Sequence, residues 1–287
     1  MLNLRSLLPL RLLPLRSLNA GQHIQCVHVE RISSRQNALV KRFRALHAGR
    51  SDDAVLLDGE HLLQEALAAR LPIEVAALAE RLAAGAAAAE LARAGIRAVV
   101  VAPQVLSAIS PVKRPSGVVT IARVRAASLD TLLAGDPPLI VILHEVQDPG
   151  NVGAVIRVAE ACGGTGVITT PGTADPFGWK SLRGSMGSAF RVPIGTKLTM
   201  TAVESALASR HIPLLTSVPR AGTPLPQADL TGPAAVLFGG EGAGLPPGVV
   251  ARSAERLSIP MRPPVESLNV SIAASLILYE AFRQRGA

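Results

Sequence analysis

Aromatic residues are scarce in this chain, at 2% of its 287 positions. An extended platform of stacked aromatic side chains, as many single-strand binders use, is therefore excluded. The chain also lacks an uninterrupted apolar run of about 18 residues, the length that a membrane-spanning helix needs. Arginines and prolines interrupt even the Leu-rich N-terminus. We therefore expect no membrane span.

Cysteine is almost absent: Cys26 and Cys162 lie far apart, and neither belongs to a C-x-x-C pair. The sequence offers no disulfide framework and no zinc site, which fits a reducing compartment. The six histidines show no ligand spacing, so we expect no metal. Cys162 ends an apolar helical stretch, which favours a core position over a reactive one.

Acidic residues are outnumbered: 21 Asp and Glu stand against 29 Lys and Arg, for a formal net charge of +8. Such a charge attracts polyanions, above all phosphate backbones. A proteome that simply prefers arginine would give the same composition. Charge alone leaves these two interpretations open.

The length predicts about two domains. Residues 1–28 form a Leu- and Arg-rich leader without acidic residues, which we expect to be unstructured. It fits a mitochondrial transit peptide, an over-extended start or a disordered basic tail, while heavy alanine usage favours a bacterial cytoplasmic protein. Short apolar runs alternate with Ala-rich helical stretches in residues 29–124, which indicates a small α/β domain. Residues 125–138 are the expected linker, and residues 139–287 the second domain.

The first domain opens with a basic helix. Residues 31–50 contain six basic side chains and no acidic one. Leu39, Val40, Phe43 and Leu46 recur at helical spacing, so the basic residues occupy the opposite face. That face is either simply solvated or directed at RNA. The candidate RNA contacts here are Arg35, Lys41, Arg42 and Arg44.

A βαβ unit opens the second domain, with strands at 139–143 and 166–170 around a helix that starts near Asn151. Asn151 is a good N-cap residue. A dinucleotide-binding turn is the competing interpretation, but G-x-G-x-x-G is absent and no acidic residue ends the following strand. Arg157 lies off the apolar stripe, on the same face as Gly153, and an ordinary exposed arginine would look the same.

We expect residues 171–195 to form a long, loop-rich segment. This segment contains Lys180, Arg183 and the chain's single tryptophan, Trp179. Positive side chains and backbone amides suit phosphate contacts.

Glycines gather near the C-terminus. An apolar strand at 235–238 runs into glycines at 239, 240, 242 and 244, with Glu241 among them. A second strand at 257–259 leads through a proline-rich loop to Ser267, Leu268 and Asn269, where a long helix begins. We expect the two strand ends to emerge side by side, with a ligand beyond their carboxyl ends. A plain strand-to-helix turn also explains the glycines.

Three segments together resemble the motifs of the SpoU/TrmH-type RNA ribose methyltransferases of the SPOUT superfamily. They are N-x-G-x-x-x-R at 151–157, FGGEGAGL at 238–245, and IPM at 259–261 with SLNVSIA at 267–273. The resemblance extends from residue 139 to the C-terminus, and more loosely before it. It implies an α/β fold: a C-terminal SPOUT domain with a parallel sheet and a deep trefoil knot, plus a small N-terminal α/β substrate-binding domain.

The resemblance also implies a cofactor, S-adenosylmethionine, bound in a bent form. The residues that it assigns to the cofactor are Gly239, Gly240, Ile259, Met261 and Leu268. The residues that it assigns to catalysis are Arg157, Asn151, Glu241, Ser267 and Asn269. A guanidinium keeps its proton, so we expect Arg157 to stabilise a developing alkoxide and hold the adjacent phosphate rather than to act as a base.

The expected activity is methylation of a ribose 2′-hydroxyl in RNA, with ribosomal RNA favoured. A transfer RNA enzyme, a methyltransferase of a base nitrogen and a non-catalytic RNA-binding protein on the same scaffold are the alternatives. The final helix, residues 270–283, is apolar on nearly every side and needs burial on more than one face. Core packing would supply that burial, but the resemblance favours a homodimer.

Overall fold

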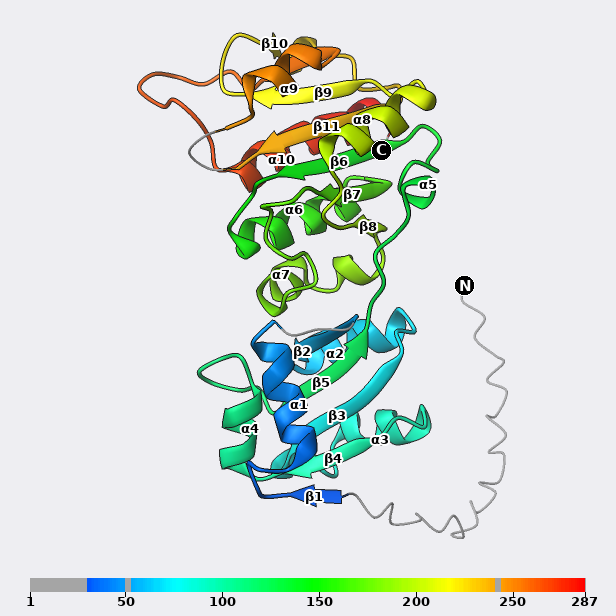
Figure 1. Cartoon of the computed structure of the whole chain (residues 1–287), viewed down its shortest axis with the longest axis vertical. Helices are drawn as coiled ribbons and strands as arrows, with labels where there is room; N and C mark the ends of the chain where they lie inside the picture. Colours follow the sequence, from blue (N-terminus) through cyan, green and yellow to red (C-terminus); the bar gives the residue numbers. More distant parts are fainter. Residues whose placement is uncertain (1–29, 50–52, 241–243, 287) are drawn as a thin grey trace, which may run out of the picture.

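The computed structural model describes residues 30–49, 53–240 and 244–286, which form two sheets, one above the other in Figure 1. The predicted leader lies outside the described residues, as do Cys26 and Glu241.

The first sheet has five strands in the order β1-β4-β3-β5-β2. β1, β4 and β3 are parallel, whereas β5 runs antiparallel to both of its neighbours. Its strands are β1 (Glu30–Ile32), β2 (Ala54–Asp58), β3 (Ile73–Ala79), β4 (Ala98–Val101) and β5 (Val118–Arg123). Its helices are α1 (Ala38–His47), α2 (Glu60–Ala68), α3 (Ala86–Arg93) and α4 (Pro103–Ile109), with a 3₁₀ turn η1 (Glu80–Leu82).

The predicted basic helix is α1. The Asn37 side chain caps it by accepting a hydrogen bond from the Leu39 amide at 2.8 Å. Val40 and Phe43 are each only 1% exposed, and they anchor the apolar face in the core. Lys41 and Arg44 are exposed, as the spacing predicts.

The second sheet has seven strands in the order β10-β12-β9-β11-β6-β7-β8, and every neighbouring pair is parallel. The long central strands are continuous apolar runs because helices cover both faces. The strands are β6 (Leu139–His144), β7 (Gly166–Thr169), β8 (Ile194–Gly195), β9 (Leu214–Val218), β10 (Thr223–Pro224), β11 (Ala234–Gly239) and β12 (Glu255–Ser258).

One face of this sheet packs on α6 (Pro149–Ala161) and α10 (Val270–Gln284). The other packs on α5 (Leu129–Leu132), α8 (Met200–Ser209) and α9 (Pro247–Arg252). The predicted βαβ unit is confirmed as β6, α6 and β7. Cys162 is 8% exposed at the end of α6, and burial raises the pKa of its thiol. It is a core residue, as predicted.

One expectation about this sheet is wrong. β9 lies between β11 and β12, so their ends are not adjacent. The loop-rich segment 171–195 also contains α7 (Trp179–Ser185) and a 3₁₀ turn η2 (Ser188–Phe190). Its Ser and Gly residues have low helix propensity, but they allow close packing on α6. A Cβ atom on Gly153 would lie 2.4 Å from the Ser181 carbonyl oxygen.

The segment predicted as a linker is ordered against the second sheet. The Ala127 amide donates to the Ile194 carbonyl oxygen at 2.8 Å, and α5 follows with Ser128 as its N-cap. Near the end of the segment, Arg285 of the C-terminus donates to the carbonyl oxygens of Pro137 and Pro138 at 3.1 and 3.4 Å.

Arg191 joins the two parts of the chain. Its guanidinium pairs with Glu65 of α2 and also with Glu160 of α6, where one hydrogen bond measures 2.9 Å. The hydrogen bonds from Arg191 hold the pKa of Glu160 below its usual value. The side chains remain 24–42% exposed, so each pair contributes modestly to stability.

Replacing Arg191 by glutamine is expected to lower the free energy of unfolding by about 1 kcal/mol at pH 7. A carboxyl with a depressed folded pKa stabilises the protein above its unfolded pKa, and this contribution is lost as the pH falls through the folded value. The difference from wild type should therefore shrink below the ordinary Glu pKa of 4.5. Urea unfolding at several pH values measures it, with exposed Arg93→Gln as the control. A difference that stays constant with pH contradicts the assignment.

Candidate active site

A cavity of about 680 Å³ opens beyond the carboxyl ends of β9, β11 and β12. Ligand sites of open parallel sheets lie at such ends. All five residues predicted to hold the cofactor line it: Gly239, Gly240, Ile259, Met261 and Leu268. Of the predicted catalytic residues, Ser267 and Asn269 also line it.

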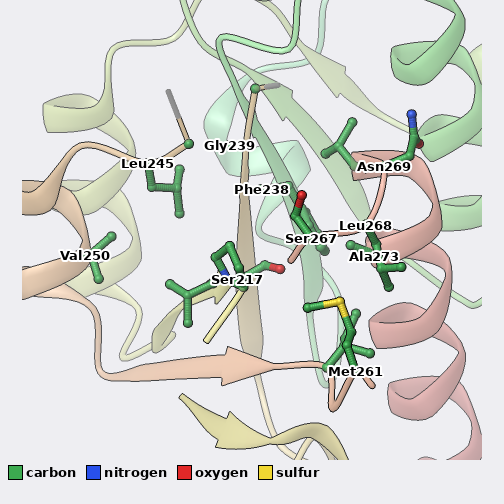
Figure 2. Close-up of a pocket in the computed structure, with 16 residues that line it drawn as sticks. Ser217, Phe238, Gly239, Leu245, Val250, Met261, Ser267, Leu268, Asn269 and Ala273 are labelled. Atoms are coloured by element: carbon green, nitrogen blue, oxygen red, sulfur yellow. The ribbon is translucent and has the colours of Figure 1, made fainter. Parts of the chain in front are cut away.

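Apolar side chains stand on both sides of this cavity (Figure 2). Leu245 and Val250 lie on one side of β11, and Met261, Leu268 and Ala273 lie towards α10. Such walls suit a flat, largely apolar ring system, while the exposed backbone of the strand ends supplies polar groups.

The end of β9 also contributes to the cavity through Ser217, Val218 and Pro219. The sequence reasoning missed these residues. Nothing local in the chain places their strand between β11 and β12.

Close backbone approach explains the glycines at the end of β11. A Cβ atom on Gly240 would lie 2.1 Å from the Glu145 carbonyl oxygen, and one on Gly239 would lie 2.8 Å from the Gly244 carbonyl carbon. The Gly240 amide donates to the His144 carbonyl oxygen at 2.8 Å. Gly239 and Gly240 therefore pack closely against neighbouring backbone, and both also line the cavity.

Asn269 connects the C-terminal helix with α6. Its side-chain oxygen caps α10 by accepting from the Ser271 amide at 2.9 Å, and its amide nitrogen donates to the Asn151 side-chain oxygen at 3.2 Å. Asn151 is 9% exposed. The contact brings residues 118 positions apart to one side of the cavity.

Asn151 does not cap α6, contrary to the prediction. Asp148 is the N-cap, and its carboxylate accepts from the Gly150 amide at 2.7 Å. Pro149 follows as the first helical residue, a position that needs no amide donor. Asn151 therefore lies inside the first turn, where its side chain reaches Asn269.

Arg157 is exposed on α6, six residues beyond Asn151, about 9 Å along the helix axis. Among the described residues it is not part of the cavity lining. Within one chain, Ser267 and Asn269 thus lie with the predicted cofactor-binding residues, and Asn151 contacts Asn269. Arg157 lies at the surface instead.

The RNA-binding candidates lie on two helices and one loop. Lys41 and Arg44 are exposed on α1, and Lys180 and Arg183 on α7. Arg35 donates to the Gln104 carbonyl oxygen at 3.2 Å. Arg42 pairs with Glu74 at 2.7 Å, so this carboxylate competes with any phosphate for its guanidinium.

Within residues 30–49, 53–240 and 244–286, no three His, Cys, Asp or Glu side chains gather as a metal site would require. In the same ranges, no helix combines the length and hydropathy of a membrane span.

Comparison with known proteins assigns the family. A sequence model of the SpoU rRNA methylase family matches residues 138–279. An uncharacterized tRNA/rRNA methyltransferase of Synechocystis is 34% identical over 273 residues, which span 89% of this chain and 94% of that protein. The chain belongs to the SpoU rRNA methylase family.

Other members resemble almost the whole chain. The 23S rRNA guanosine 2′-O-methyltransferase RlmP of Bacillus subtilis is 26% identical over 88% of this chain and 98% of its own length. An AdoMet-bound rRNA methyltransferase from Sinorhizobium meliloti superposes with a TM-score of 0.80, at 28% identity over 89% of this chain and 98% of that chain. The AdoMet complex of AviRb from Streptomyces viridochromogenes has a TM-score of 0.79, at 29% identity over 87% and 98%.

Proposed function

We propose that this protein transfers a methyl group from S-adenosylmethionine to a ribose 2′-hydroxyl of ribosomal RNA. The observation that carries the proposal is the cavity at the ends of β9, β11 and β12, lined by residues of the second and third family motifs and adjoining the first through Asn151. The related RlmP acts on a guanosine of 23S rRNA. Transfer RNA is the alternative substrate, because the Synechocystis relative is named for both RNA classes.

The cavity fits S-adenosylmethionine. Its volume of about 680 Å³ is typical of sites for ligands of this size. Leu245, Val250 and Ile259 offer apolar surface for an adenine ring. At Gly240 the absent side chain leaves the loop close against Glu145, so the cavity wall is backbone. When bound, the sulfonium supplies an electrophilic methyl group.

The chain's own groups then have distinct tasks. Backbone groups of Gly239, Ile259 and Leu268 hold the adenosine, and Gly240 and Met261 complete its surroundings. Asn269 and Asn151 fix the N-terminus of α10 against α6. Ser267 and Glu241 orient the ribose, with Glu241 assigned by the family motif alone.

Arg157 acts on the RNA. Its guanidinium is a permanent cation, so it grips a phosphate by charge-assisted hydrogen bonds and stabilises the negative charge that develops on the 2′-oxygen. The exposure of Arg157 on α6 suits a group that meets a large polyanion.

The first sheet, within residues 29–124, serves as the substrate-binding domain, with residues 125–138 as the linker and residues 139–287 as the methyltransferase domain. Its RNA contacts begin at Lys41 and Arg44, which are exposed, with Arg35 and Arg42 beside them. Lys180 and Arg183 continue the contact on α7. The trefoil knot of the resembling family would thread the C-terminal chain here, and the Asn269 contact with α6 is consistent with such threading. A cytoplasmic location would give access to ribosomal RNA.

The protein forms a homodimer through α10. One side of this helix is buried in the core through Ala274, Ile277 and Ala281. The other exposes large apolar side chains at helical spacing: Ile272 at 51%, Leu276 at 43%, Tyr279 at 60% and Phe282 at 37%. An apolar stripe of this kind marks an interaction surface.

The decisive experiment maps 2′-O-methyl groups in ribosomal and transfer RNA from a strain that lacks the gene, before and after treatment with the pure protein and S-adenosylmethionine. A site restored only in ribosomal RNA establishes the proposed substrate. Arg157→Ala should slow this methylation at least about 100-fold. Calorimetry should show an unchanged affinity for S-adenosylmethionine, because Arg157 does not line the cavity. Joint loss of both would contradict the proposed role, and Arg93→Ala is the control.

Gly240→Ala should weaken S-adenosylmethionine binding at least about tenfold, because moving packed backbone costs on the order of 1–3 kcal/mol. The added Cβ atom meets the Glu145 carbonyl oxygen. Gly248→Ala is the matched control, since its Cβ atom would meet only the Arg252 side chain, at 3.6 Å. Titration calorimetry compares the two variants. Equal affinities would place the cofactor elsewhere.

Leu276→Glu should convert the dimer into a monomer, because a carboxylate at the centre of the stripe would be desolvated without a partner. Sedimentation velocity reports the mass. Met186→Gln also changes an exposed apolar residue, 40% accessible on the end of α7, and should leave the dimer intact. A wild-type protein that sediments as an active monomer refutes the interface.

A further inference from the structure

The helices α1 and α7, which both carry exposed basic side chains, meet at the junction of the two sheets. The C-terminal end of α1 points towards α7 (Figure 1), and the His47 and Trp179 rings lie 6.3 Å apart at 79°. Trp179 is the only tryptophan in the chain. We call Arg44, His47, Trp179, Lys180 and Arg183 the junction cluster.

The indole of Trp179 is partly exposed and lies beneath a cation. The Lys180 ammonium sits 5.5 Å from the ring centroid, and the Trp179 side chain keeps part of its surface accessible. Arg44, Lys180 and Arg183 of the cluster are exposed. The Asp58 carboxylate interacts electrostatically with Arg183, but it is bound by the Ser110 hydroxyl, at 2.7 Å, and burial raises its pKa.

The cluster lies close to the predicted reaction site. α7 packs on α6 at the point where the Ser181 carbonyl oxygen approaches Gly153. Ser181 follows Trp179 by two residues, and Gly153 follows Asn151 by two residues. Packed helices are about 8–10 Å apart, which is a few nucleotide steps. An RNA strand that delivers a ribose to this site can reach the junction cluster with a nucleotide a few steps away along the strand.

Packing alone does not account for this arrangement. The ion pairs of Arg191 also connect the two parts of the chain, so they do not depend on the contact between His47 and Trp179 alone. A cation over an exposed indole contributes about 0.5–1 kcal/mol, whereas a stacked base contributes roughly 1–3 kcal/mol. A base can therefore displace the Lys180 ammonium, which is then available to a phosphate.

We propose that Trp179 is a substrate-positioning residue that stacks on an unpaired RNA base a few nucleotides from the methylated one. His47 supports the indole edge, and Arg44, Lys180 and Arg183 hold the flanking phosphates. The low aromatic content excludes an extended platform, but a single stacking position needs one ring. This inference rests on the proposed RNA methyltransferase function.

The intrinsic fluorescence of the full-length protein tests the stacking directly, because its only tryptophan is Trp179. The probes are a single-stranded RNA of roughly a dozen nucleotides, the same strand in a duplex, and an abasic strand with the same backbone. The single strand should quench the fluorescence, and the duplex and abasic strands should quench it much less. Equal quenching by the abasic strand, or none by the single strand, overturns the proposal.

Kinetics with ribosomal RNA from the deletion strain provide the second test. Trp179→Leu keeps an apolar contact for His47 but lacks a ring, and it should raise KM for RNA roughly tenfold at an unchanged kcat. Trp179→Phe should recover part of the loss. Arg44→Gln should instead weaken all RNA binding and reduce its salt dependence by about one phosphate contact. A wild-type KM in Trp179→Leu contradicts stacking.

The two proposals fail differently. If the wild-type protein methylates no RNA but its fluorescence still responds only to unpaired bases, the proposed activity is wrong and the stacking site stands. If methylation proceeds and neither Trp179 variant changes KM, only the stacking site is wrong.

Discussion

The hydrogen bond from Asn269 to Asn151 is the contact on which the candidate site depends. It fixes the start of α10 against the first turn of α6, and the same Asn269 side chain caps α10. The loop between β12 and α10 supplies one wall of the cavity, so its position follows from where α10 begins. One amide side chain thus sets both the helix start and the position of one cavity wall.

Two glycines, Gly153 and Gly240, shape the candidate site because they lack a side chain. At Gly153 the absence of a Cβ atom lets the backbone of α7 approach α6, and at Gly240 it lets the cofactor-side turn rest on the Glu145 carbonyl. The first approach brings the cationic side chains of α7 beside α6, and the second makes backbone part of the cavity wall. The glycines therefore arrange the site without taking part in its chemistry.

Much of this was readable from the sequence, because continuous apolar runs and helical spacing are local patterns. The βαβ unit and the basic helix follow from them, whereas the cavity-lining motif residues were implied by the resemblance to the SpoU/TrmH-type family. The predictions that were wrong depend on contacts between distant segments or on competition between neighbouring residues for one position. The position of β9 between β11 and β12 depends on strand order, and Asp148 displaces Asn151 as the cap because Pro149 fits the first turn. The pairing of Arg42 with Glu74 spans 32 residues and leaves no local pattern.

The effect of the net charge of +8 depends on where the basic side chains lie and on which of them are paired with carboxylates. Arg191 and Arg252 are bound by carboxylates of neighbouring elements, so their charges serve the fold. Lys41, Arg44 and Lys180 are exposed on helices that meet at the junction of the two sheets, on the path from the basic helix to α6. A polyanion gains most where cations are not already neutralised, since a paired guanidinium must first give up its carboxylate. The junction is therefore the surface on which the proposed RNA would gain most from the protein's positive charge, and it is also where the chain places its single indole.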